Sequence, residues 1–257
     1  MQDYQEQRRE LVALLRSGLP ANRAARIESQ IRDTIAITPR EPRKADSAVG
    51  ATRLGGSPDL PEGQAWPSQE DGRVEFVGQL RLEELAPFDI HHRLPPTGLL
   101  SFFHGFLTGG EYGVEGHVFY FPDAPRGLAP VFDPHRKRRG QPRPVGVELA
   151  PLALLPPHSS HLVPREGPDD PYVTLYDARY HELYDGDLRF HGLFGFERPL
   201  EHGEGEQRED EEMLLRLDAG GVPYDFVEAA CAYYYVAKRD LERRDFSSVR
   251  LLEGATI

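Results

Sequence analysis

The stretch Thr52–Pro67, TRLGGSPDLPEGQAWP, is where the character of the sequence changes. Its sixteen residues hold three glycines, three prolines and the only tryptophan of the chain. This composition is typical of turns, because glycine reaches left-handed backbone conformations and proline fixes φ. Before the stretch, apolar residues recur at helical spacing, and after it they form short runs between Gly and Pro clusters. The stretch is therefore either the opening turn of a sheet-rich domain or a loop that carries chemistry.

The residues before this stretch predict helices. Apolar residues recur three or four positions apart over 4–17 and again over 22–34. A short strand, TIAITP, and a Pro-containing linker follow up to residue 50. We expect residues 1–48 to form an N-terminal helical segment that packs on a main domain of residues 49–257.

The rest of the chain predicts an antiparallel sheet. Seven apolar runs read as strands, namely residues 76–82, 98–106, 117–121, 145–149, 172–176, 212–217 and 231–238. Short helical turns fit 82–85 and 177–183, and the proline-rich region 122–170 predicts irregular surface excursions. Because most connections are of hairpin length, we expect an α+β fold, mainly antiparallel sheet, with N-terminal helices.

Two parts of the sheet region look alike, one at about 52–106 and one at about 191–238. Each has a Gly turn, then an apolar strand with one central polar residue, then an aromatic strand. The central polar residues are Gln79 and Arg216. We interpret the two parts as internally duplicated half-units related by a pseudo-twofold axis, with chance similarity among short strands as the alternative.

The charge of the chain is acidic and uneven. There are 42 acidic and 30 basic residues, for a net charge of −12, which argues against general nucleic-acid binding. Half of this net charge falls in Glu201–Glu212, EHGEGEQREDEE. That segment is a solvated loop, an acidic contact surface for a basic partner protein or a weak cation site.

Composition also points to a compartment. No apolar run is long enough for a membrane span, and the first twenty residues do not resemble a signal peptide. The single cysteine, Cys231, fits a reducing environment. We therefore expect a cytoplasmic protein that does not contact a membrane. The sequence does not indicate an oligomeric state.

Standard catalytic and metal-binding signatures do not occur in the sequence. It has no Gly-x-Ser-x-Gly elbow, no P-loop and no dinucleotide fingerprint. Its ten histidines lack cysteine partners or a His-Glu-x-x-His helix, so we expect no metal and no cofactor. An enzyme is the less favoured interpretation.

Five residues are candidates for a ligand-binding cleft: Arg53, Trp66, Gln79, His191 and Arg216. Gln79 and Arg216 interrupt apolar strands, so each either ties down a neighbouring turn or converges with the other at the axis. Arg216 would favour an anionic ligand. His191 is either a structural hydrogen-bonding residue or an acid/base group, and Trp66 is either a core plug or a stacking platform.

Several motifs together resemble the YwqG-like family, a bacterial domain family of unknown function. They are LGGSPDLPEGQAWP, FVGQLRLEEL, LPPTGLLSFF, FHGLFGFERPL, EMLLRLDA and RDLERRDFSSVRLL, in this order over about residues 50–252. The resemblance implies an α+β fold with an internal duplication. The chain departs from the pattern at Arg216, where the family usually has glutamine, and at Glu197, where it has proline. It also lacks the family's Trp-Gly-Asp, so we expect a divergent member.

Two functions follow as hypotheses. The first is a non-catalytic binding or protein-interaction module whose acidic surface contacts a basic partner. An immunity protein is one form that such a module takes. The alternative is an enzyme or small-molecule binder that uses a polar cleft between the half-units for an anionic ligand.

Overall fold

The computed structural model describes residues 4–68, 72–107, 114–137, 140–184, 191–197, 207–218 and 231–254. Helices are α1 (Tyr4–Gly18), α2 (Ala21–Glu28), α3 (Leu82–Leu85), α4 (Pro171–Tyr184) and α5 (Lys238–Glu242), with a 3₁₀ turn η1 (Lys44–Ser47). Strands are β1 (Arg32–Arg40), β2 (Arg53–Gly55), β3 (Asp59–Pro61), β4 (Gly72–Arg81), β5 (Leu99–Leu107), β6 (Val114–Phe121), β7 (Leu128–Pro130), β8 (Pro144–Leu154), β9 (His191–Leu193), β10 (Glu211–Asp218), β11 (Cys231–Ala237) and β12 (Val249–Gly254).

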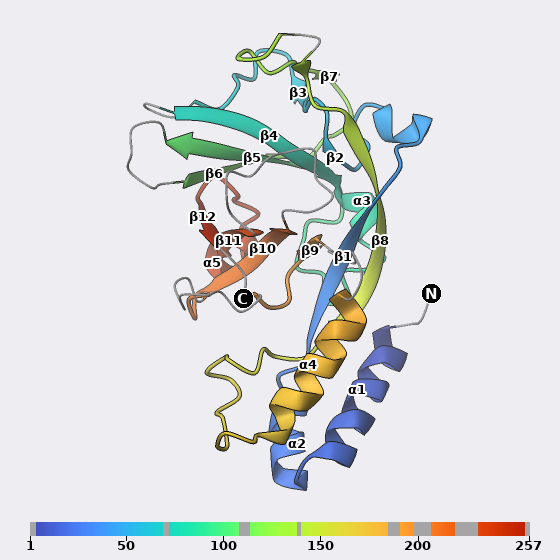
Figure 1. Cartoon of the computed structure of the whole chain (residues 1–257). Helices are drawn as coiled ribbons and strands as arrows, with labels where there is room; N and C mark the ends of the chain where they lie inside the picture. The colour runs from blue at the N-terminus through green and yellow to red at the C-terminus, as the bar shows by residue number, and fades with distance from the viewer. Residues whose placement is uncertain are drawn as a thin grey trace.

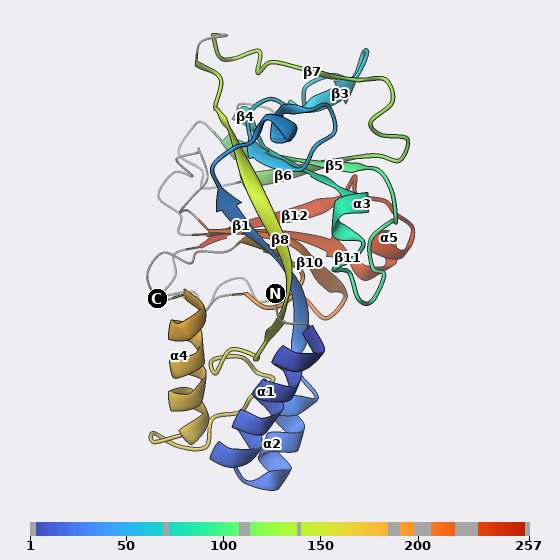
Figure 2. The same cartoon turned by 90° about the vertical axis from the view of Figure 1, so that its right-hand side faces the viewer.

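Ten of the strands form one antiparallel sheet in the order β12-β11-β10-β9-β1-β8-β2-β4-β5-β6. The sheet curves until its two edge strands, β6 and β12, lie against each other, which closes it nearly into a barrel (Figures 1 and 2). Their contact is close, because a Cβ built on Gly116 of β6 would lie 3.1 Å from the Cβ of Leu251 in β12. The short pair β3–β7 lies over β4 and β5 at the top of Figure 1.

The long antiparallel pair β1–β8 is the middle of the sheet. The two strands pair along all nine residues of β1, from Arg32 opposite Leu154 to Arg40 opposite Gly146. Four strands follow on each side of this pair, β9–β10–β11–β12 on one side and β2–β4–β5–β6 on the other. The sheet thus includes a strand that precedes residue 49, and the boundary expected at 48–49 stays a prediction.

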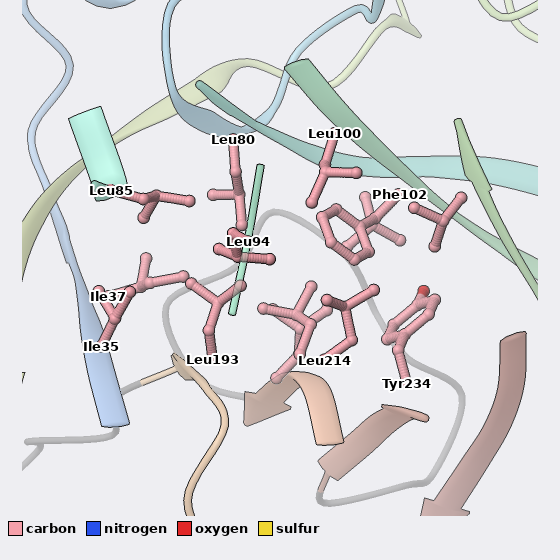
Figure 3. Packing of buried hydrophobic residues seen from close by; sticks show 14 of the residues in the cluster. Ile35, Ile37, Leu80, Leu85, Leu94, Leu100, Phe102, Leu193, Leu214 and Tyr234 are labelled. Atoms are coloured by element: carbon pink, nitrogen blue, oxygen red, sulfur yellow. The ribbon is translucent and has the colours of Figure 1, made fainter. Parts of the chain in front are cut away.

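The main core fills the space between the two sets of four strands. Figure 3 shows Leu80 and Leu100 pointing into this space from one wall and Leu193 and Leu214 from the other, with Ile37 of β1 beside them. All five are at most 1% exposed. Apolar side chains on the inner face of every wall are what the alternation of strand residues produces.

Helices α1, α2 and α4 form a second packing unit at one end of the sheet (Figure 1). Leu11 and Leu15 of α1, Ile27 of α2 and Tyr172 of α4 pack in one buried cluster, which stabilises helices that would be marginal alone. Gln7 of α1 connects this unit to β8, where it donates to the Pro151 carbonyl and accepts from the Ala153 N–H. None of the helices in the described ranges is both long and apolar enough to cross a membrane.

The expected fold class is confirmed in its main features, an α+β structure with a large antiparallel sheet and N-terminal helices. The helix expected over 22–34 is too long, because α2 ends at Glu28 and the central strand begins at Arg32. Within the proline-rich region 122–170, the strand expected over 145–149 is present but longer, because β8 has eleven residues.

The strand expected over 172–176 is wrong, because these residues belong to α4. Asp170 accepts a hydrogen bond from the Tyr172 N–H at the start of the helix, and Pro171 occupies the first helical position. These are strong helix-start signals, and they override the strand preference of the aromatic and β-branched residues that follow.

A substitution at Gly195 tests the turn after β9. Gly195 has φ +88°, and an added Cβ would lie 2.9 Å from Leu154 Cδ1 and 3.2 Å from Thr34 Cβ. We expect Gly195→Ala to lower the free energy of unfolding in urea by about 3 kcal/mol, from backbone strain and overpacking together. The matched control is Gly63→Ala, where φ is +80° and no atom lies within 4 Å, so strain acts alone. Equal losses in free energy of unfolding in the two variants would contradict the close packing of Gly195 against Leu154 and Thr34.

Candidate functional site

The first group of predicted site residues surrounds the carboxylate of Asp59. Arg53 and Gln79 lie opposite each other on the paired strands β2 and β4. One oxygen of Asp59, Oδ2, accepts from Gln79 Nε2 at 2.7 Å, from the Gly50 N–H at 2.8 Å and from Arg53 Nη2 at 2.9 Å. All three residues are buried, with at most 4% of each exposed.

The remaining bonds of this group go to the backbone of the Gly-rich turn. Gln79 Oε1 accepts from the Asp59 N–H at 2.9 Å, and Gln79 Nε2 also donates to the Ala51 carbonyl at 2.9 Å. Arg53 Nη2 donates to the Ser57 carbonyl at 2.6 Å. Both side chains therefore hold the turn over residues 50–59, which is the first of the two roles that the sequence leaves open for a polar residue in this strand.

The second group lies at β9 and β10. Arg216 Nη1 donates to the Phe196 carbonyl at 3.4 Å, and Arg216 Nη2 lies 3.7 Å from Asp218 Oδ2. His191 Nδ1 accepts from the Asp218 N–H at 3.0 Å. His191, Arg216 and Asp218 are all at most 2% exposed. Like Gln79, Arg216 contacts the turn that follows the neighbouring short strand.

His191 is held in its neutral form. Burial lowers the pKa of His191 to about 4, the nearby Arg216 guanidinium also lowers it, and the Asp218 carboxylate opposes the shift. Because Nδ1 accepts a hydrogen bond, the ring hydrogen of this neutral imidazole is on Nε2. Nε2 is buried and has no hydrogen-bond partner in the described part of the chain.

The pKa of His191 predicts a pH-dependent stability. The unfolded state takes up a proton near the ordinary histidine pKa of about 6.5, whereas the folded state resists protonation down to about pH 4. Stability is therefore lost as pH falls through this window. We expect His191 to contribute a loss of about 2 kcal/mol between about pH 7 and about pH 5.

The measurement compares urea unfolding of the wild type and His191→Asn at both pH values. The asparagine side chain keeps an acceptor for the Asp218 N–H but does not titrate. The difference between the two proteins removes the contribution of the other histidines. Equal pH dependence in both proteins would contradict a neutral buried His191.

Trp66 lies apart from both groups. Its ring packs edge-on against Phe103, with centroids 5.3 Å apart, and its Nε1 donates to the Val74 carbonyl at 2.9 Å. The side chain belongs to an aromatic cluster under the β3–β7 pair. The ring is partly buried on this cluster and its polar atom is satisfied, and the choice between a core plug and a stacking platform stays open.

The structure thus brings together Arg53 with Gln79 and His191 with Arg216, and it keeps the two pairs apart. In the sheet, β1 and β8 lie between β9 and β2. Gln79 alternates with the inward Leu80, and Arg216 lies between two core leucines, so both are on the outer faces of their strands. The space between the two walls is filled with apolar side chains (Figure 3). A ligand-binding role for the five residues stays a prediction.

One polar contact that the sequence does not indicate lies where the barrel closes. His104 of β5 is fully buried, and its Nε2 lies 3.0 Å from Glu253 Oε1 of β12. The two residues join strands from opposite ends of the sheet. No local signal could reveal this pair, since it depends on how the sheet curves.

The acidic segment Glu201–Glu212 is described only from residue 207 onward. Glu211 makes a bidentate ion pair with Arg250, at 2.6 and 2.9 Å, and Glu212 lies 3.6 Å from Arg93. Glu209 and Asp210 are exposed on the turn before β10. Two of the four described acids are therefore neutralised within the fold, and two face solvent.

Most of the chain matches the model of a known protein family. A family model described as a domain of unknown function, DUF1963, matches residues 52–252, which include β2 and all but the end of β12. No curated protein matches the chain. Both polar groups lie inside the matched region, whereas α1, α2 and β1 precede it.

Proposed function

The chain belongs to DUF1963, a family of domains of unknown function, and on that premise we propose that it is a non-catalytic binding module. Its partner would be a basic protein that contacts an acidic surface, in the manner of an immunity protein. The proposal that the module is non-catalytic rests on the hydrogen bonds of the Gln79 side chain. Its amide spans Asp59 and Ala51 and is fully buried, so its polar atoms serve the turn.

The binding part rests on charge. The net charge of −12 makes a basic partner approach faster and suppresses association with other acidic proteins. Glu209 and Asp210 are exposed, and both lie in the segment that carries half of the net charge. Within the described part of the chain their carboxylates have no ion-pair partner, so they are available for such contacts.

The experiment is affinity capture from the native host, followed by binding measurements with the purified captured protein. We expect a basic partner whose dissociation constant rises about tenfold in the double variant Glu209→Lys/Asp210→Lys. The control variant is Glu62→Lys/Glu84→Lys, which makes the same charge change at exposed residues elsewhere. An equal loss in both variants, or binding that does not weaken with salt, would contradict the proposal.

Lineage and compartment belong to the same proposal. The two half-units are supported by twin turns: Gly55 and Gly56 have φ +66° and +75°, and Phe194 and Gly195 have φ +66° and +88°. A buried phenylalanine with a positive φ is rare. Phe194 therefore favours descent of this turn from an ancestral copy that had glycine at the same position.

The motifs resemble the YwqG-like family, and the single cysteine fits the cytoplasm.

A second candidate function is binding of a small anion near His191. The observation that favours it is the Nε2–H donor of His191, which is buried beside Arg216 and has no partner in the described residues. The test adds phosphate, sulfate and small carboxylates while the His191 ring is followed by NMR. A saturable shift that disappears in Arg216→Gln would support this function, and no shift with any of the anions would exclude these ligands.

A further inference from the structure

A groove on the N-terminal helices carries positive charge on an otherwise acidic protein. Its lining includes Arg8, Arg9 and Arg16 of α1 and Glu28 of α2, with Val12 and Ala13 among the arginines. Three guanidinium groups thus face one carboxylate, whereas the whole chain has a net charge of −12. The groove is therefore a local basic site.

The spacing of the arginines follows from the helix. Arg9 and Arg16 are seven residues apart, so they lie on one face of α1 and are about 10 Å apart along its axis. Val12 and Ala13 fall between them on this face. Glu6 and Glu10 are not among the residues that line the groove, although at 100° per residue Glu6 lies about 60° from Arg9 on the side of Ala13. The face offers two positive groups with a small apolar surface between them.

The guanidinium groups keep most of their hydrogen-bonding capacity. Arg16 Nη2 donates to Glu28 Oε2 at 2.9 Å, Arg8 Nη2 to the Glu28 carbonyl at 3.3 Å, and Arg9 Nε to the Gln5 carbonyl at 3.2 Å. A guanidinium has five N–H donors, so each retains donors for a further partner. The Arg16 side chain is 65% exposed, which makes it accessible.

The groove lies on a firmly held support. The opposite face of α1 is buried through Leu11 and Leu15, and Gln7 bonds to the backbone of β8. Arg23 anchors α2 through two bonds of 2.6 Å to Asp170. Because the helix backbones are already fixed, the conformational entropy that this chain loses on binding comes from its arginine side chains. Both helices lie outside the matched family region of residues 52–252, so the groove is an addition to that domain.

We propose that this groove docks an acidic amphipathic helix of a partner protein. Two carboxylates about two turns apart on that helix bind Arg9 and Arg16, because the planar guanidinium suits bidentate carboxylate recognition. A small apolar side chain between them packs on Val12 and Ala13. This surface is separate from the acidic one of the proposed function, and it selects a partner of opposite charge.

The structure favours a peptide over a membrane or a nucleic acid. A helix that lies on a membrane needs a broad exposed apolar face, whereas α1 buries Leu11 and Leu15 against its neighbours α2, α4 and β8 and exposes a single leucine, Leu14 (Figure 2). Single-stranded nucleic acid is usually held by aromatic side chains that stack on bases, and the groove lining has none. The small apolar surface flanked by arginines matches the helix-in-groove mode of peptide recognition.

The test uses the full chain and a synthetic probe. The probe is a fluorescein-labelled helical peptide of about 15 residues, with two glutamates seven positions apart, leucine between them, and alanine and glutamine elsewhere. A scrambled peptide of the same composition is the ligand control. The protein variants are Arg9→Gln/Arg16→Gln in the groove and Arg239→Gln/Arg243→Gln at exposed positions near α5. Fluorescence anisotropy measures binding, and circular dichroism checks that each variant is folded.

We expect the probe to bind the wild type and the α5 control alike, with affinity about tenfold weaker in the groove variant and weaker at higher salt. The scrambled peptide should bind at least about tenfold more weakly than the probe. Failure of the probe to bind at low salt would overturn the proposal, as would equal losses in both variants or equal binding of the scrambled peptide. Arg9- and Arg16-dependent binding of phosphatidylserine vesicles or of a single-stranded oligonucleotide, with no binding of the probe, would also overturn it.

Discussion

Asp59→Ala is expected to lower the free energy of unfolding by about 4 kcal/mol. Asp59 Oδ2 accepts three hydrogen bonds, including the one from Arg53, and the carboxylate is fully buried. Alanine would leave the Arg53 guanidinium buried without its carboxylate partner, and it would remove the acceptor of the Gly50 N–H and Gln79 Nε2. A buried charge that has lost its partner is strongly destabilising, which makes this one of the two largest effects that we expect.

Urea unfolding of matched variants measures this effect. Glu62→Ala changes an exposed carboxylate in the same segment and should stay within about 0.5 kcal/mol of the wild type. Asp59→Asn keeps an acceptor oxygen but removes the charge. Its loss in free energy of unfolding should lie between those of Glu62→Ala and Asp59→Ala, and it remains measurable if Asp59→Ala does not fold. A loss in Asp59→Ala of less than about 1 kcal/mol would show that the carboxylate does not hold the turn.

Arg23→Ala is expected to have an effect of similar size, about 3–5 kcal/mol. Arg23 bonds to both oxygens of Asp170 at 2.6 Å, and both side chains are 2% exposed. The substitution leaves the Asp170 carboxylate buried with only its N–H partners, those of Glu166 and Tyr172. Because this pair joins α2 to the start of α4, its loss should loosen the whole helical unit.

The control is Arg26→Ala, an exposed arginine on the same helix. It makes the same change in helix propensity, so the difference between the two variants isolates the ion pair. The hydrogen bonds from Arg23 hold the pKa of Asp170 well below its ordinary value, so the stabilisation is present above about pH 4 and is lost as pH falls below it. A difference between the two variants of less than about 1 kcal/mol at neutral pH would contradict the anchoring role.

Local patterns predict much of the fold, and the failures have physical causes. The leucine spacing of α1 and the apolar run of β4 depend only on neighbouring residues, so both elements are found close to their predicted positions. The strand expected over residues 172–176 is wrong because the Asp170-Pro171 helix start outweighs the strand preference of the residues that follow. Tertiary packing of Tyr172 then completes the helix.

The candidate site is predictable only in part. A polar residue inside an apolar strand must find partners, and this reasoning locates Gln79 and Arg216 correctly as buried groups. Which partners they find depends on the register of β2 with β4 and of β9 with β10, and the sequence does not contain that information in local form. The His104–Glu253 contact depends in the same way on the curvature of the whole sheet.

The most direct measurement concerns the amide hydrogen of Asp59, which donates to Gln79 Oε1 at 2.9 Å. If the polar side chain in β4 serves the Gly-rich turn, hydrogen exchange by NMR should find this amide protected in the wild type. In Gln79→Leu its exchange should be at least about 100-fold faster, while amides in β11 keep their relative protection. Unchanged protection of the Asp59 amide in a folded Gln79→Leu variant would contradict a structural role for Gln79 and would favour a ligand-binding one.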